Sequence, residues 1–258
     1  MIFILRVFAA TGILLLLICN AGGTEKIPVN LELVLAIDTS LSVDDQEFEL
    51  QRQGLANAFL HPDVVNAILA HSEGGIAIAI IHWAGENKQQ TAVDWMLIRT
   101  QLDARLLSAQ IRAASRKVIG QTDIGGAILY STAILNNNAY QGARRVIDVS
   151  GDGSGEAEST ALARDYAISQ SVTINGLVIY NEDIDLGVLS NIAIRHHYQE
   201  FVIGGNGAFL MVAEDFDDFA IAIRRKLVRE IYGPNLALPE FDKVRNLRAQ
   251  IKRILNDL

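Results

Sequence analysis

Short runs of hydrophobic residues recur along the chain, each about as long as a β-strand. Several runs are apolar at consecutive positions, which is typical of strands that helices cover on both faces. One further segment mixes polar and apolar residues and predicts a short strand at the edge of a sheet. The five apolar strands are predicted at Leu31–Ile37, Ile76–Trp83, Val146–Val149, Val172–Ile179 and Phe209–Val212, and the edge strand at Thr91–Leu97.

Segments with helical spacing separate these strands. In the last of them Phe216, Phe219, Ile223 and Leu227 form one apolar stripe. Alternating strands and helices predict one α/β domain, a three-layer, Rossmann-like sandwich whose doubly wound, mainly parallel sheet has helices on both faces. The helices are predicted at Asp44–Leu60, Thr100–Ser115, Ile124–Asn136, Glu156–Ser169, Asp185–Tyr198 and Asp215–Ile231.

The first residues have the composition of an export signal. Arg6 precedes an uncharged apolar run that ends at Cys19 and is short for a membrane helix. We therefore expect a signal peptide over residues 1–23, with cleavage after Ala21 and export to the periplasm or the cell exterior. A retained membrane anchor is one alternative. Lipidation at Cys19 is another, although bulky Ile18 stands where a lipoprotein signal carries a small residue.

Residues 233–258 predict a separate amphipathic helix. A Gly-Pro pair ends the preceding helix, and the segment from Phe241 to Leu258 has an apolar stripe with basic residues elsewhere. We expect this helix to pack on its own domain. Binding to a partner protein is the alternative.

Composition excludes several classes of protein. Half of the 258 residues are hydrophobic and 20% are charged, which allows a sizeable core and argues against global disorder. The net charge of −8 argues against non-specific binding to nucleic acids. Cys19 is the only cysteine, so cleavage of the signal would leave no disulfide, cysteine zinc site or cysteine nucleophile.

Oxygen-bearing side chains gather in three loops of the predicted fold. Asp38, Ser40 and Ser42 follow the first strand, Thr122 precedes a helix in VIGQTDIGGAI, and Asp152 follows a strand in RRVIDVSGDGSGE. Ligands of open α/β sheets bind beyond the carboxyl ends of the strands, where such loops meet. Each motif alone also has a simpler interpretation. The first is compatible with a turn and helix cap, Thr122 with an N-cap, and Asp152 with a hydrogen bond inside its own loop.

Taken in order, the five residues resemble the metal-ion-dependent adhesion site of von Willebrand factor A domains, written Asp-x-Ser-x-Ser, then Thr, then Asp. The resemblance covers about Val29 to Tyr232. The segments RVIDVSGDG, TINGL, VIGGNGAF and AIRRKL are further similar to a little-characterised bacterial family of exported A-domain-like proteins. The resemblance implies a von Willebrand A-like domain over residues 29–232, a bound Mg²⁺ (or Mn²⁺ or Ca²⁺) and a protein ligand. It also implies that the hydroxyls contact the metal directly, whereas the aspartates often act through water.

The chemistry of these side chains agrees with that assignment. Mg²⁺ prefers octahedral oxygen ligands and tends to keep some of its waters. Two carboxylates neutralise the charge of the ion and the hydroxyls add no further anion, so the ion can still accept a carboxylate from outside. We expect a non-enzymatic binding module whose partner protein supplies an acidic side chain, with no nucleic acid and no small-molecule substrate.

A metal-dependent hydrolase of the phosphatase type is the main alternative. A haloacid-dehalogenase-type site needs a second aspartate two positions after the first, where this chain has Ser40. The segment GDGSGE, from Gly151 to Glu156, lacks the third glycine of a dinucleotide-binding motif. No Gly-x-Ser-x-Gly or His-Glu-x-x-His motif occurs. A third possibility is an A domain whose metal site is vestigial.

Titratable residues outside the five have open roles. His82 ends a predicted strand, where we favour a structural role over a place in the cleft. His196 and His197 would point about 100° apart on a helix and so do not share one ion. Asp148 lies mid-strand on the same face as Asp152 and needs a partner if it is buried. It either supports the site or forms an internal ion pair.

Overall fold

The computed structural model describes residues 25–180 and 187–233. The predicted signal peptide and the predicted C-terminal helix after Gly233 lie outside the described residues, as does the predicted helix start at Asp185. Their bounds therefore stay predictions, as does the boundary of the domain at residues 29–232.

Six strands form one sheet in the order β3-β2-β1-β4-β5-β6. Neighbouring strands run parallel except for β2 and β3, which are antiparallel, so the strand predicted at the edge does lie at the edge. The strands are β1 (Ile27–Asp38), β2 (Ile76–Trp83), β3 (Gln89–Ile98), β4 (Tyr140–Gly151), β5 (Thr173–Ile179) and β6 (Leu210–Ala213).

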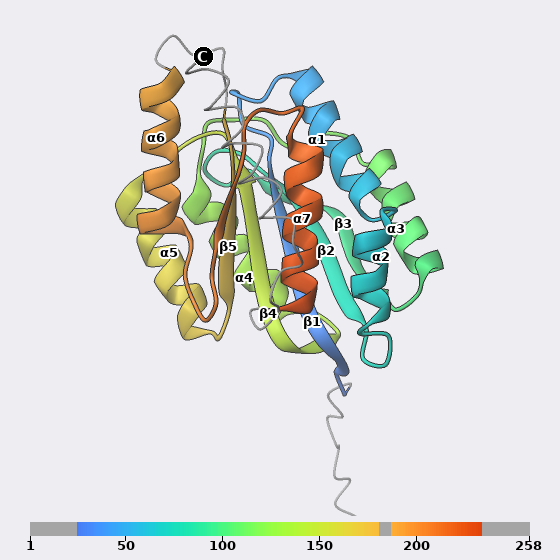
Figure 1. Cartoon of the computed structure of the whole chain (residues 1–258). Helices are drawn as coiled ribbons and strands as arrows, with labels where there is room; N and C mark the ends of the chain where they lie inside the picture. The colour runs from blue at the N-terminus through green and yellow to red at the C-terminus, as the bar shows by residue number, and fades with distance from the viewer. Residues whose placement is uncertain (1–24, 181–186, 234–258) are drawn as a thin grey trace, which may run out of the picture.

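Helices cover both faces of this sheet, as Figure 1 shows. One apolar core lies between the sheet and α1, α2, α3 and α7, and a second lies between the sheet and α4, α5 and the turn after α6. This arrangement confirms the predicted three-layer α/β fold. The helices are α1 (Asp45–Ala58), α2 (Pro62–Leu69), α3 (Gln101–Ala113), α4 (Ile124–Asn136), α5 (Ala157–Ser169), α6 (Gly187–His197), the π-helical turn η1 (Tyr198–Val202) and α7 (Phe219–Tyr232). Within the described ranges, every helix is too short or too polar to span a membrane.

Apart from shifts of up to four residues at other ends, such as β1 starting at Ile27 and α7 at Phe219, the structure departs from the predicted elements in two places. Helix α2 was not expected, because its apolar stripe spans only two turns; Pro62 at its first position and the His61 side chain, which accepts from the Asp63 N–H, start it locally. Strand β4 begins at Tyr140 and not at Val146. Residues at its start alternate between half-buried and exposed, so no apolar run marks them.

The register of β1 and β4 decides which loops meet. The two strands are parallel neighbours, and Ile37 lies opposite Ser150. Because both strands end one residue later, the loops that begin at Asp38 and Asp152 leave the same edge of the sheet side by side. The chain continues from β1 to β2 on one side of this point, whereas β4 and β5 lie on the other, which makes it a topological switch point of the sheet.

Candidate metal centre

The loop after β1 turns back on its own first residue. Asp38 and Ser40 are buried, whereas Ser42 is exposed. The Ser40 N–H donates to Asp38 Oδ1 at 2.7 Å, which is the turn that the simpler interpretation expects. The other carboxylate oxygen, Asp38 Oδ2, is buried and accepts no hydrogen bond from the described residues. A turn alone leaves this second oxygen unexplained.

Two serine hydroxyls connect this loop to the loop after β4. Ser40 Oγ and Ser42 Oγ lie 3.0 Å apart. Ser42 Oγ donates to Asp152 Oδ1 at 2.7 Å, a contact between residues 110 positions apart in sequence. Asp152 is itself buried. The turn and cap interpretation does not account for this contact, and the cap of α1 is Asp44, which accepts from the Glu47 N–H at 2.8 Å.

Thr122 faces the same place from the third loop. A Cβ placed on Gly153 would lie 3.0 Å from Thr122 Oγ1, so the threonine hydroxyl rests against the backbone just after Asp152. The N-cap of α4 is Asp123, whose Oδ1 accepts from the Gly126 N–H at 2.9 Å. Thr122 is therefore not the cap, and its hydroxyl stays available to the cluster.

A glycine is required where β4 ends. A Cβ on Gly151 would lie only 2.6 Å from Asp38 Oδ2, closer than real Cβ contacts. Gly151 and Gly153 thus let the β4 loop approach Asp38 and Thr122. The structure brings all five predicted residues together from three loops.

The electrostatics of the cluster favour a cation. Burial and the neighbouring Asp152 carboxylate raise the pKa of Asp38 to about 8, more than the Arg116 guanidinium lowers it. A cation between the carboxylates would reverse this effect. Among the described residues no three His, Cys, Asp or Glu side chains form a metal cluster, so the available donors are two carboxylates and three hydroxyls. This donor set suits a hard ion such as Mg²⁺ better than zinc.

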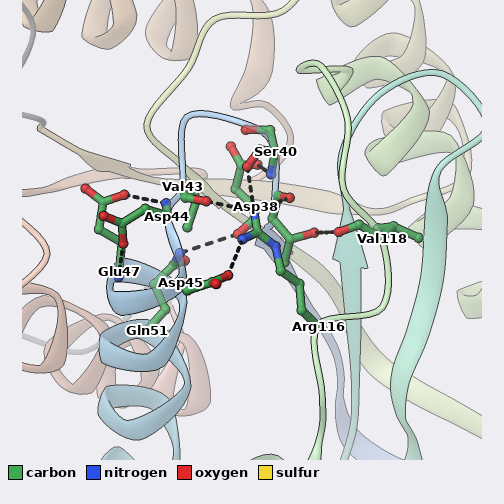
Figure 2. Close-up of polar contacts among 10 residues, drawn as sticks. Asp38, Ser40, Val43, Asp44, Asp45, Glu47, Gln51, Arg116 and Val118 are labelled. Carbon is green, nitrogen blue, oxygen red and sulfur yellow. Dashed lines mark hydrogen bonds and ion pairs between the residues drawn. The ribbon is translucent and has the colours of Figure 1, made fainter.

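Arg116 holds the first loop in place and was not found from the sequence. Its Nη2 lies 2.8, 2.7 and 2.7 Å from the carbonyl oxygens of Thr39, Ser40 and Val43. Figure 2 shows this side chain reaching the loop beside Asp38. The Thr39 hydroxyl donates to the Val118 carbonyl at 2.8 Å, which adds a second connection to the same segment. Backbone carbonyls carry no sequence signal, so no pattern could have identified Arg116.

The histidines have structural roles or lie apart. His82 is buried, its Nδ1 accepts from the Lys117 N–H at 3.3 Å, and its ring meets the Phe48 ring edge-on. Burial lowers the pKa of His82 to about 4, so it stays neutral. His196 is exposed and His197 is buried, as expected for neighbours that point apart.

Asp148 forms the internal ion pair that was one of its two predicted roles. Lys226 Nζ of α7 lies 2.8 Å from Asp148 Oδ1 and 2.6 Å from Glu230 Oε1. Asn175 of β5 donates to the same Glu230 oxygen at 3.0 Å. All four side chains are buried. Burial, and next the Glu230 carboxylate, raise the pKa of Asp148 to about 8. We call Asp148, Asn175, Lys226 and Glu230 the lysine network.

Several solved structures have a fold similar to that of this chain. The chain is similar to the pilus adhesin SpaC of Lactobacillus rhamnosus GG, with 14% identity and a TM-score of 0.58 over 81% of this chain and 31% of the adhesin. It is also similar to proximal thread matrix protein 1 from the mussel byssus with a zinc-occupied MIDAS motif, with 12% identity and a TM-score of 0.54 over 79% of this chain and 48% of that one. An aerotolerance-related membrane protein of Bacteroides fragilis matches with 16% identity and a TM-score of 0.51, over 79% of this chain and 99% of that one. The chain thus spans about a third of the adhesin and about half of the byssus protein.

The fold is that of von Willebrand factor A domains, which agrees with the resemblance seen in the sequence. The chain belongs to the family described as "Protein of unknown function (DUF1194)", which matches residues 28–235. No curated protein matches the chain.

Proposed function

We propose that this protein is an exported, non-enzymatic module that binds a partner protein through a divalent cation, Mg²⁺. The observation that carries this proposal is the buried Asp38 Oδ2, which accepts no hydrogen bond from the described residues and lies beside a second buried carboxylate. A buried carboxylate normally has a hydrogen-bond donor or a counter-charge. A cation would supply it.

Each residue of the cluster has a defined task in this proposal. Asp38 and Asp152 balance the charge of the ion, and the hydroxyls of Ser40, Ser42 and Thr122 donate oxygens without adding charge. When bound, Mg²⁺ supplies an electrophilic position that accepts a carboxylate of the partner. Ser42 and the adjacent Leu41 are exposed, so a partner can approach from this side.

The structural neighbours agree with a binding role. One is a pilus adhesin, and another holds zinc in a MIDAS motif. The choice of Mg²⁺ over Zn²⁺, Mn²⁺ or Ca²⁺ rests on the oxygen-only donor set of this chain. The acidic partner rests on the charge balance of the cluster.

The engaged side chains around the cluster support the proposed absence of turnover. A hydrolase would need a general base near the ion, and His82 is buried, already hydrogen-bonded and, with a pKa of about 4, a weak base. We expect no metal-dependent hydrolysis of phosphate esters, peptides or acyl esters. Reproducible hydrolysis that disappears in Asp38→Ala would favour the phosphatase-type alternative.

Capture of a partner tests the proposal directly. The immobilised protein is incubated with the native envelope fraction in Mg²⁺ and again in EDTA, with Asp152→Ala in parallel. We expect a partner that is retained only by the parent protein and only in Mg²⁺. Equal capture in EDTA would exclude a metal bridge, and calorimetry without divalent binding at millimolar concentration would exclude the metal itself.

Export has a separate test. We expect the mature chain to begin near Gly22 and to be recovered outside the cytoplasm. Intact Met1 on a cytosolic protein would contradict this part of the proposal.

A further inference from the structure

Tyr198 is a buried tyrosine whose hydroxyl has no hydrogen bond with the described residues. It is the first residue of η1 and is fully buried in the core beneath α5. Buried hydroxyls are normally hydrogen-bonded, because an unmet one costs free energy. A tyrosine here in place of phenylalanine therefore needs a reason.

Tyr198 packs against two strands at positions where each has a glycine. A Cβ on Gly176 of β5 would lie 2.9 Å from its ring carbon Cδ1. A Cβ on Gly151 of β4 would lie 2.9 Å from its hydroxyl oxygen and 2.6 Å from Asp38 Oδ2. Because both oxygens are this close to one point and make no direct hydrogen bond, they lie within reach of each other through a single water.

The Tyr198 hydroxyl and Asp38 Oδ2, neither of which has a hydrogen bond with the described residues, therefore lie near each other. The phenol keeps its proton and acts toward a carboxylate as a donor. A hydrogen-bond donor on η1 and an acceptor on β1, both without a partner among the described residues, thus lie close together.

The location of Tyr198 on a π-helical turn fits this role. Helix α6 continues into η1 at Tyr198, and the wider turn changes the direction of the side chains that follow the helix. Single π-helical turns occur frequently at functional sites. Together with the two glycines, this turn brings a side chain from a fourth segment of the chain to the oxygen cluster.

We propose that Tyr198 is a positioning residue of the metal site, whose hydroxyl donates a hydrogen bond toward Asp38 Oδ2 and orients the ionised carboxylate for the cation. This inference rests on the proposed metal-binding function. Hydrogen bonds to metal-ligating groups orient them, and their loss typically lowers metal affinity by about 10- to 100-fold. If Tyr198 had a purely structural role, loss of its hydroxyl would leave metal affinity unchanged, because the aromatic ring alone would fill the core.

Tyr198→Phe separates these roles, since it keeps the ring and removes the hydroxyl. Mg²⁺ and Mn²⁺ affinities are measured by calorimetry on the full chain, and the melting temperature is measured in EDTA. We expect affinity to fall by about tenfold or more. We expect the melting temperature in EDTA to stay the same or rise, because an unmet buried hydroxyl is gone.

Tyr130→Phe is the matched control. Its hydroxyl pairs with the Thr91 hydroxyl at 3.2 Å on the surface of α4 and β3, and its loss should leave metal affinity unchanged. Tyr198→Phe with the affinity of the parent protein would overturn the inference and leave the proposed function standing. Weaker binding together with a clearly lower melting temperature in EDTA would also overturn it, because the hydroxyl would then support the fold. A parent protein that binds no divalent ion would overturn both.

Discussion

Asp148 and Asp152 lie four residues apart where β4 ends, and each is buried beside a second carboxylate. Asp148 shares Lys226 with Glu230, so its cluster contains a cation from the chain itself. Asp152 accepts from the Ser42 hydroxyl, which contacts the Ser40 hydroxyl beside Asp38, and these hydroxyls carry no charge. A buried carboxylate pair that holds a lysine has its own counter-charge, whereas a pair linked through neutral hydroxyls leaves a place for a cation from solution.

Solvent access separates the two clusters as well. Lys226 of α7 is 0% exposed. The oxygen cluster ends at the exposed Ser42, with Leu41 70% exposed beside it. The lysine network therefore lies inside the fold, whereas the oxygen cluster is open to the proposed partner.

The largest effect should come from removing the internal cation. Lys226→Met leaves Asp148 and Glu230 buried together without a counter-charge, which should lower the free energy of unfolding by about 3–5 kcal/mol. Urea unfolding measures this loss. Arg105→Met is the control, because it removes an exposed positive charge on α3 and should cost at most about 0.5 kcal/mol. A small loss in Lys226→Met would mean that the two carboxylates do not need the lysine.

Adding the missing cation should have the next largest effect. At a hundredfold excess over its dissociation constant, Mg²⁺ should stabilise the protein by roughly 2.7 kcal/mol, and EDTA should reverse the shift. Asp152→Ala should abolish the response, because the hydroxyls cannot replace its charge. The metal-free variant should lose little stability, since removal of one carboxylate relieves repulsion with Asp38. Asp165→Ala, at an exposed surface carboxylate, should respond like the parent; a response of Asp152→Ala would place the metal elsewhere.

The pH dependence should distinguish the two carboxylates. The folded state holds the Asp148 proton up to a pKa of about 8, whereas the unfolded state releases it near 3.8. The stability that this proton contributes is complete at low pH and is lost as the pH rises from about 4 to 8, by up to ~1.4 kcal/mol per pH unit. Stability measured across this window should therefore fall more steeply in the parent than in Asp148→Asn.

Asp38 should behave in the same way only without metal. In EDTA its raised pKa gives the same sign and window, because burial and Asp152 keep it protonated in the folded state. Mg²⁺ should cancel the Asp38 contribution and leave that of Asp148 intact. Identical pH slopes with and without Mg²⁺ would count against a cation at Asp38.

Arg116 should give the smallest of these effects. Arg116→Lys keeps the positive charge but loses the planar donor group that meets three carbonyls of the loop. We expect metal binding to weaken by about 1 kcal/mol with little change in stability, measured by calorimetry and thermal melting. Arg112→Lys, whose guanidinium contacts Gln53 and Asn57 on α1, is the control and should bind metal normally. Equal affinities of the two variants would remove Arg116 from the site.

Local pattern was enough for most of the fold. Apolar strands alternating with amphipathic helices predicted the three layers, because burial on both faces of a parallel sheet leaves a direct trace in the sequence. Helix α2 and the start of β4 left no such trace, since one is short and the other is exposed on alternate residues. The cluster of Asp38, Ser40, Ser42, Thr122 and Asp152 was predicted as a set because its order in the chain matches a known motif.

Only the tertiary structure decided what surrounds the cluster. Arg116 contacts backbone carbonyls 73 to 77 residues away, and backbone atoms are the same in every sequence. Tyr198 lies near Asp38 because glycines on two neighbouring strands leave room for its ring and hydroxyl. The sequence left two roles open for Asp148, because its partner depends on how α7 packs against β4. In the structure, this packing places Lys226 beside Asp148. Short-range periodicity determines the elements, whereas contacts between side chains far apart in sequence exist only once those elements have packed.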